Sequence, residues 1–545
     1  MNFLQKSGLL IGGYSPGFKS FIPAILKILA ALIATCFCAS SMAQTNTNSY
    51  IGVNNGAWTT AGNWSLGVVP NSNQAVVISN GVVARNLGSS AAAYSVLVGG
   101  ASGTSTLGFE TAGNALAVAT DLTLAPGAGM GHLRFVRENT SLTLNGGSGH
   151  ILRRAGSGEA RLEFRGGFSG SLGLTSATVD NLLLAGTTTG TLSITNGQTY
   201  NVSGEARVTT AGTTSGTGVL NVAGGVLNMG GASLFGTTGE LVLNSGTNAA
   251  NTATVNLSGG GSIVAKEIRR DNAGAGAAFN WADGTIGTRS DADLTLSALA
   301  GTLDIFLAGT GTHTFDAATG RTITVASTAV LADKTGEQGT LTKTGAGTLN
   351  LSGTNTYRGG TTVHGGTLLV NGSLLSTNTI VSSGAILGGS GSLQAVTLQG
   401  GSLAPGNSPG LLYMTSLDAS NGFLDFELGA PTTRGVTYDA INVQNLLKLG
   451  SNTAWTFSVY NNYAFQLNDT YDLMDWGTLD ASGYDNNTLL NALPDLNTAS
   501  TDLKWEVSNF TLDGTVSVIP EPDTATLLML GFAGLVATRI YNRKR

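Results

Sequence analysis

The chain has 545 residues, of which 41% are hydrophobic, only 11% are charged and 79 are glycine. Disordered chains combine low hydrophobicity with high net charge, so this composition argues against disorder and favours short strands joined by glycine turns. The formal net charge is −6, and it becomes −11 without residues 1–43 and 520–545, which hold seven basic and two acidic residues; an acidic body without a basic footprint excludes nucleic acid as an expected partner.

Residues 1–43 have the organisation of a secretory signal peptide. Lys6, Lys19 and Lys27 form a positive leader, residues 28–38 are mostly apolar, and small residues precede Gln44. This pattern predicts export and cleavage by signal peptidase between Ala43 and Gln44. A permanent membrane anchor is the alternative, but the apolar run is short for the roughly 20 residues that a membrane-spanning helix needs.

The two cysteines of the chain, Cys36 and Cys38, both fall inside this signal. The mature chain would therefore contain no disulfide, and its stability would come from packing and backbone hydrogen bonds. A lipoprotein signal ending at Cys36 is a second alternative, although Thr35 is a poor residue to precede an acylated cysteine.

Residues 44–100 contain an aromatic segment with Trp58, Trp64 and Pro70. A repetitive β-structure needs an end that covers its first coil, and two large aromatics with a proline turn suit an N-terminal cap. The alternative is a carbohydrate site, because aromatic faces also stack on sugar rings.

Residues 101–410 consist of short strands separated by glycine, asparagine, serine and threonine. Examples are residues 219–222, 240–243 and 252–257, and the alternation of Thr, Ser or Asn with Val, Leu or Ile in this region is typical of half-buried strands. Glycine-led strands start at Gly366, Gly384 and Gly401, at intervals of 18 and 17 residues. A period near 20 residues suits one coil of a parallel β-solenoid that buries its apolar face only against neighbouring coils.

Residues 347–368 carry a more specific pattern, with Tyr357, Gly359 and Gly360 followed by a Thr-Thr-Val strand at residues 361–363. This segment resembles the autotransporter-associated β-strand repeat of bacterial passenger regions. The resemblance implies a solenoid on an exported protein. Autotransporters end in an outer-membrane barrel, whereas a short tail ends this sequence, so the resemblance supports the solenoid rather than self-transport.

Two segments of this region contain residue types that catalysis uses. Residues 406–410 match the letters of a Gly-x-Ser-x-Gly nucleophile elbow, but Pro409 lacks the N–H that the oxyanion hole needs, so a turn is expected. The best candidates for a glycan-cleaving solenoid enzyme are a charged run and two later acids: Lys266, Glu267, Arg269, Arg270, Asp271, Asp291 and Asp293. A charge run is usually a solvated face, and no catalytic residue is assigned.

Residues 411–517 are richer in aromatic residues and are expected to form a separate C-terminal β module. Asp469, Asp472 and Asp475 lie close together and raise the alternative of a calcium site. They lack the glycine and glutamate spacing of an EF-hand, so solvated loop carboxylates are expected instead. The four histidines share no metal-ligand spacing, and neither a metal nor a cofactor is expected.

Residues 518–545 form a three-part tail. Pro520, Glu521 and Pro522 precede the apolar residues 525–537, and a basic cluster follows, made of Arg539, Arg543, Lys544 and Arg545. The prolines keep the motif extended, and the basic cluster would stay on the cytoplasmic side of a membrane. The tail resembles the PEP-CTERM sorting signal, with a plain tail anchor as the alternative. The resemblance implies a transient inner-membrane anchor, processing by an exosortase and association with exopolysaccharide.

Together these features predict an all-β protein: a glycine-rich, right-handed parallel β-solenoid with an N-terminal cap and a C-terminal β module, plus a signal peptide and a C-terminal membrane helix. The expected function is that of a structural or adhesive protein of the cell surface or extracellular matrix, and not of an enzyme. Expected partners are signal peptidase, an exosortase-like enzyme, the membrane and an exopolysaccharide. The alternative function is a β-solenoid polysaccharide lyase or glycoside hydrolase.

Overall fold

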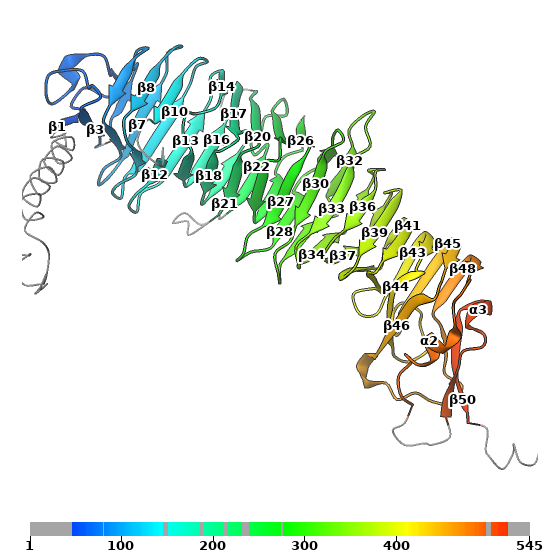
Figure 1. Ribbon diagram of the computed structural model, residues 1–545. Coiled ribbons are helices and arrows are strands. Elements are labelled where there is room, and N and C mark those ends of the chain that lie inside the picture. Colours follow the sequence, from blue (N-terminus) through cyan, green and yellow to red (C-terminus); the bar gives the residue numbers. More distant parts are fainter. Residues whose placement is uncertain are drawn as a thin grey trace, which may run out of the picture.

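The computed structural model describes residues 46–521, apart from residues 80, 145–150, 186–188, 211–214, 231–238, 274–275 and 497–502. The expected signal peptide, with Ala43 and Gln44, lies outside these residues, as do Pro522 and the rest of the tail. Figure 1 shows the described strands stacked one after another in a long array, with β1 and β50 at opposite ends of it.

The array is a parallel β-solenoid whose central coils each contribute three strands. One coil consists of β18 (Thr199–Val202), β19 (Glu205–Arg207) and β20 (Thr217–Ala223), and the next of β21 (Val226–Met229), β22 (Glu240–Leu243) and β23 (Thr252–Ser258). Each strand pairs in parallel with the corresponding strand of the next coil. The strands expected at residues 219–222, 240–243 and 252–257 are therefore confirmed, and the stacking places them in three separate sheets.

The first sheet runs the whole length of the solenoid (Figure 1). In stacking order its strands are β1 (Asn46–Ser49), β3 (Gln74–Ile78), β6 (Ser95–Val98), β9 (Leu122–Leu124), β12 (Ile151–Arg154), β15 (Ser176–Val179), β18, β21, β24 (Ser262–Ala265), β27 (Gly284–Thr288), β30 (Thr312–Asp316), β33 (Thr340–Thr344), β36 (Thr361–Val363), β39 (Asn378–Ser382), β41 (Ser392–Gln399), β43 (Leu411–Asp418), β45 (Ala440–Lys448) and β48 (Met474–Asp480), with β35 (Thr354–Asn355) and β38 (Ser373–Leu374) beside them.

The second sheet runs parallel to the first along the same length. Its strands are β2 (Gly56–Ala57), β4 (Val83–Arg85), β7 (Thr104–Phe109), β10 (Met130–Phe135), β13 (Ala160–Phe164), β16 (Asn181–Leu184), β19, β22, β25 (Glu267–Arg270), β28 (Leu294–Ala298), β31 (Thr322–Val325), β34 (Thr348–Leu351), β37 (Gly366–Val370), β40 (Ala385–Gly389), β42 (Ser402–Pro405), β44 (Asn421–Leu428) and β46 (Asn452–Val459).

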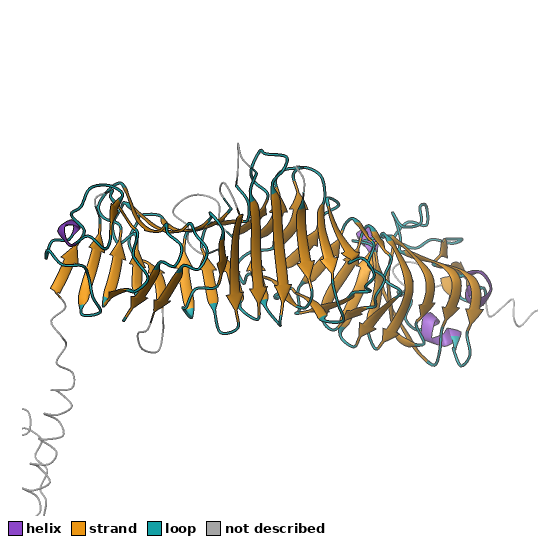
Figure 2. Ribbon diagram, turned by 90° about the horizontal axis from the view of Figure 1, so that it is seen from above, coloured by secondary structure: helices purple, strands orange, loops and turns teal. Residues whose placement is uncertain are grey.

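The third sheet covers only the central coils. It contains β14 (Phe168–Gly170), β17 (Thr189–Thr195), β20, β23, β26 (Ala277–Trp281), β29 (Leu303–Leu307) and β32 (Ala329–Asp333). A shorter parallel sheet of β5 (Ala91–Ala93), β8 (Ala115–Val118) and β11 (Ser141–Leu144) belongs to the earlier coils. The described strands and their connecting loops alternate regularly along the array (Figure 2).

Side chains that point into the solenoid form one continuous apolar core. In β23, for example, Ala253, Val255 and Leu257 are fully buried, while the residues between them are half-buried on the outer face. Equivalent residues of successive coils stack on one another, because parallel strands in register lie about 4.8 Å apart. Phe109, Phe135 and Phe164 form such a stack, with ring centroids 4.4 and 5.2 Å apart.

The repeat expected at Gly366, Gly384 and Gly401 is present, but its register differs from the expected one. The structure pairs Gly366 with Ala385 rather than with Gly384. Gly384 adopts φ +77° in the turn before the strand, so the expected glycine-led alignment was wrong by one residue in this coil. Because a shift of one residue turns every side chain to the other face, Leu387 is buried and Ile386 is 38% exposed.

Three aromatic side chains pack together in the first coil of the solenoid. Trp58 and Trp64 are buried, with ring centroids 4.8 Å apart, and Tyr50 packs edge-on against Trp64 at 5.1 Å. The Trp64 Nε1–H donates to the carbonyl oxygen of Trp58 at 2.7 Å. The 3₁₀ turn η2 (Ala61–Asn63) lies between the two tryptophans. Both indole rings face the core, so neither offers a free face to a sugar, and packing accounts for this segment.

At the other end both long sheets continue beyond residue 410. β43 pairs with β41 and β45, and β44 pairs with β42 and β46, all in parallel. The 3₁₀ turn η3 (Tyr460–Asn462) follows β46. The C-terminal part also contains an antiparallel sheet of β47 (Thr470–Asp472), which precedes β48, β50 (Thr515–Pro520) and β49 (Leu503–Glu506), with the short helices α2 (Asn486–Leu490) and α3 (Phe510–Asp513). Within the described residues, no helix has the length and apolar character needed to cross a membrane.

Candidate functional site

The sorting motif starts where the described fold ends. Pro520 is the last residue of β50 and pairs with Leu503 of β49, and Glu521 follows it as an exposed residue. Pro522, Arg539, Arg543, Lys544 and Arg545 lie outside the described residues, so the role assigned to them stays a prediction.

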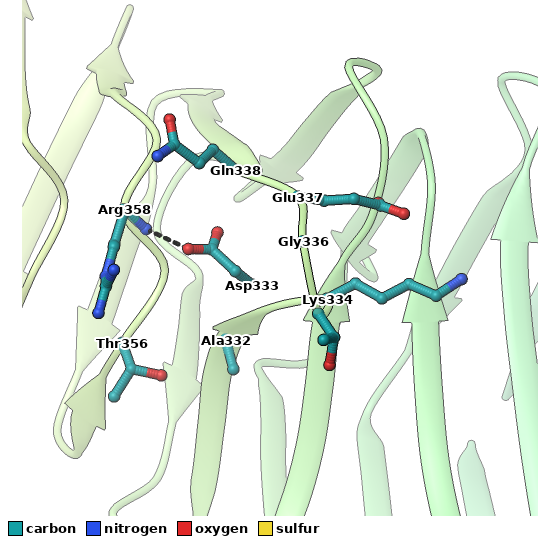
Figure 3. A pocket seen from close by; sticks show the side chains of 9 residues that line it. Ala332, Asp333, Lys334, Gly336, Glu337, Gln338, Thr356 and Arg358 are labelled. Carbon is teal, nitrogen blue, oxygen red and sulfur yellow. Dashed lines mark hydrogen bonds between the residues drawn. The ribbon is translucent and has the colours of Figure 1, made fainter.

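A surface pocket of about 470 Å³ lies at the end of the third sheet (Figure 3). It is lined by Ala332 and Asp333 of β32, by the loop of residues 334–338, and by Thr356 and Arg358 of the following coil. No motif in the sequence marks these residues as a site. Residues 332–338 and residues 356 and 358 meet only because one coil stacks on the next.

The acidic groups of this pocket hold its backbone in place. The Asp333 carboxylate accepts hydrogen bonds from the backbone N–H groups of Gly339 at 2.9 Å and Arg358 at 3.0 Å. The Glu337 carboxylate accepts one from the backbone of Gly309. The side chains of Lys334 and Arg358 are exposed, and in Figure 3 the Arg358 side chain extends away from Asp333 along the wall beside Thr356.

A second, smaller cavity of about 210 Å³ lies near the C-terminal coils and is lined by three carboxylates, Asp425, Glu427 and Asp439. Asp439 is buried and accepts hydrogen bonds from the backbone N–H groups of Gly410 at 2.6 Å and Glu427 at 2.7 Å. Burial, with the nearby Glu427 and Asp425 charges, raises the pKa of Asp439 to about 7, although the two backbone donors act in the opposite direction. Burial also raises the pKa of Asp425.

Ser408 lies at the rim of this second cavity, within the segment that matches the letters of a nucleophile elbow. The segment forms a turn, and the strand β43 follows it in place of the helix that an elbow requires. The expectation of a turn at residues 406–410 is therefore confirmed.

The charged run at residues 266–271 forms ion pairs on the outer face of the second sheet. Arg269 contacts the carboxylates of Glu240, Glu267 at 3.0 Å and Asp271 at 2.6 Å. Arg270 is buried and donates to three backbone carbonyl oxygens. The other two acids considered for a glycan-cleaving enzyme also have partners. Asp291 forms an ion pair with Arg289, and Asp293 accepts a hydrogen bond from the backbone N–H of Thr322.

The three aspartates considered for calcium do not form a cluster. Asp469 accepts a hydrogen bond from the backbone of Gln466 at 2.7 Å, whereas Asp472 and Asp475 both pair with Arg434. The expectation of loop carboxylates was wrong for Asp472 and Asp475, which lie in β47 and β48. In the described part of the chain, no group of three or more His, Cys, Asp or Glu side chains is arranged to hold a metal ion.

The coil that resembles a passenger repeat is organised around Tyr357. This side chain is fully buried, and its hydroxyl lies 2.6 Å from the hydroxyl of Thr361, which donates to Ser376 at 2.8 Å. Lys343, also buried, donates to the carbonyl oxygens of Thr344 and Gly345 at the preceding corner. The repeat thus supplies polar partners for backbone and side-chain groups that the coil buries.

A search of curated proteins returned no match. Residues 341–370 match the family model of the passenger-associated transport repeat. The matched residues run from β33 through β34 and β36 to β37, about one coil of the solenoid. The chain therefore carries an autotransporter-associated repeat within a longer stack of parallel strands, and this repeat implies an exported or surface-exposed protein.

Proposed function

We propose that this protein is a structural or adhesive rod of the cell surface or extracellular matrix, sorted through its C-terminal tail by an exosortase-type enzyme. The observation that carries the proposal is the unbroken parallel stack from β1 to β48, which contains the passenger-type repeat at residues 341–370. A solenoid of this kind presents a long surface and needs no catalytic centre to do so.

The position of the motif supports the sorting part of the proposal. Pro520 ends the last strand, β50, and Glu521 follows it as an exposed residue, so a processing enzyme could reach the motif without opening the core. On this proposal the chain is exported through cleavage before Gln44, is held briefly in the inner membrane by residues 525–537, and is then released to the surface. The right-handed winding and the module boundaries at residues 100 and 410 stay predictions.

The test is intact-mass analysis of protein extracted from the surface of intact cells. The expected mature protein starts at Gln44 and has lost the residues after the motif. Substituting Pro520, Glu521 and Pro522 together by alanine should leave the tail attached, while substituting Asp523 and Thr524 should have no such effect. Tail loss that does not depend on the motif, or an unprocessed chain in the cytoplasm, would contradict the proposal.

The second candidate function is a glycan-cleaving enzyme, and the cavity with Asp425, Glu427 and Asp439 is the observation that favours it. A carboxyl group whose pKa is raised to about 7 could act as a general acid near neutral pH. Release of reducing ends or unsaturated sugars from a polysaccharide by the purified protein, abolished by Asp425→Asn, would support this candidate against the rod.

A further inference from the structure

The third sheet has an outer face without charged residues over four consecutive strands. In β17, β20, β23 and β26 the side chains between the buried positions are small polar or aliphatic groups. These outward residues are Thr189, Thr191, Ser193, Thr195, Thr217, Val219, Asn221, Ala223, Thr252, Thr254, Asn256, Ser258, Ala278 and Asn280. Figure 1 labels three of these strands, β17, β20 and β26, in succession along the array.

A row of amides runs along the middle of this face. Parallel register places Ser193, Asn221, Asn256 and Asn280 directly above one another. The side-chain amide of each asparagine donates to the residue before it, at 3.0 Å for Asn221 to Ser193 and at 2.8 Å for the next two steps. We call these four residues the asparagine row.

The asparagine row keeps hydrogen-bonding capacity for a ligand. A carboxamide has two N–H donors and two acceptor lone pairs, and the contacts within the row use one donor and one lone pair of Asn221 and Asn256. Because the contacts fix the amide orientation, a ligand that binds the remaining groups would not have to order them first.

The row leads to an aromatic side chain and then to the pocket of Figure 3. Asn280 is in register with Phe306 of β29, which is half-buried on the outer face, and Phe306 is in register with Ala332 of β32. Ala332 lines the pocket, beside Asp333 and Arg358. Amides, an aromatic ring and a pocket with an exposed guanidinium thus follow one line along the solenoid axis.

We propose that the asparagine row, Phe306 and the pocket form an axial binding track for a linear, hydroxyl-rich polysaccharide. Successive coils are roughly 4.8 Å apart, which is close to the advance of one pyranose unit in an extended polysaccharide. Successive sugars can therefore each meet an asparagine amide on the three coils that carry Asn221, Asn256 and Asn280. Amides and threonine hydroxyls match sugar hydroxyls, and the ring of Phe306 offers an apolar surface for the C–H face of a sugar.

The inference builds on the proposed surface function, because that location would bring the track to extracellular glycans, but its test is independent of location. The full chain, purified in detergent, is run in native gels containing hydroxyethyl cellulose or polygalacturonate, and the dissociation constant is obtained from the retardation. The double variant Asn256→Ala with Phe306→Ala should weaken binding at least tenfold. Arg358→Ala keeps the backbone N–H that binds Asp333, and it should weaken binding of the acidic polygalacturonate more than of the neutral glucan.

The matched control is Asn228→Ala. Asn228 donates to Asn201 at 3.0 Å in an equivalent amide pair of the first sheet, outside the proposed track. Its substitution should leave binding unchanged, and circular dichroism checks that all variants remain folded. Absence of binding to both polysaccharides, an equal loss in Asn228→Ala, or self-association of the chain through the same residues would overturn the inference. Surface exposure of a non-binding protein would leave the proposed function standing and reject the track alone.

Discussion

Gly359 and Gly360 of the passenger-type repeat provide a matched pair for testing how tightly the coils are stacked. A Cβ atom at Gly359 would lie 2.6 Å from the carbonyl carbon of Gly339 in the neighbouring coil, and closer still to its oxygen. A Cβ atom at Gly360 would meet its nearest neighbour, the carbonyl oxygen of Asn378, at 3.7 Å. Adjacent glycines of one motif thus differ in whether they can accept a side chain.

The expected loss of stability in Gly359→Ala follows from the hydrogen bonds between coils that the clash would break. Restoring normal carbon–oxygen contact requires the coils to separate by about 1 Å. The hydrogen bond from Leu341 N–H to the Gly360 carbonyl oxygen, 2.9 Å long, and the adjacent pairing of β33 with β36 would then exceed hydrogen-bonding distance. Two or three lost bonds at roughly 1 kcal/mol each give about 2–3 kcal/mol of local destabilisation.

The assay is amide hydrogen exchange of the folded chain, read on peptides from residues 340–365. Gly359→Ala should speed exchange there by roughly 30- to 150-fold, since 1.4 kcal/mol corresponds to a factor of ten. Gly360→Ala should change it little. Peptides of β3 and β6 serve as an internal control, because each coil contacts only its neighbours. Equal effects of the two substitutions would refute the reasoning.

The stability of the C-terminal coils should fall as pH rises from about 4 to 7, because the folded state holds the Asp439 proton up to a pKa of about 7 while the unfolded chain releases it near 3.9. The full loss of unfolding free energy is on the order of 4 kcal/mol. Urea unfolding at a series of pH values, followed by hydrogen exchange of peptides around Glu427, should show this loss, and a flat pH profile would count against the burial of Asp439. Tyr357→Phe should lower the free energy of unfolding of its coil by about 1–2 kcal/mol, because it removes one buried hydrogen-bond partner of Thr361. Hydrogen exchange in the same coil measures this loss. A loss as large as that of Tyr357→Ala would show that the hydroxyl network is not the cause. Trp58→Ala should lower the free energy of unfolding of the first coils by about 3–5 kcal/mol. Hydrogen exchange should then become faster in β1–β4 alone, whereas equally faster exchange along the whole rod would disprove a local cap.

Strand alternation predicted much of this fold, because inward and outward residues differ in polarity wherever a strand covers a core. It indicated most of β20 and β23, whereas β22 was expected as a short strand between Gly, Asn, Ser and Thr residues, and all four of its residues are buried. Alternation could not fix the pairing of Gly366 with Ala385, since glycine can precede a strand in a turn or begin it, and only the burial of Leu387 settles which.

The pocket could not be predicted for a different reason. Coil length varies along the chain: Val226 pairs with Ser262, 36 residues later, whereas Thr362 pairs with Ile380, 18 residues later. Without a constant period, the sequence does not show that Asp333 meets Arg358, or that Asn256 meets Asn280. The charged run at residues 266–271 was visible, and Arg269 pairs with Glu267 and Asp271 inside it, but the third partner, Glu240, comes from the previous coil.

The stacking of coils also determines how the rod should respond to force. Tension applied between its two ends acts along the hydrogen bonds that join one coil to the next, so coils should detach singly, starting from an end. The coil between Thr314 and Thr342 spans 28 residues and contributes one strand spacing to the folded length, yet it would release on the order of 90 Å of extended chain when it opens. A tethered molecule of this design would lengthen in steps under shear and keep its hold while doing so.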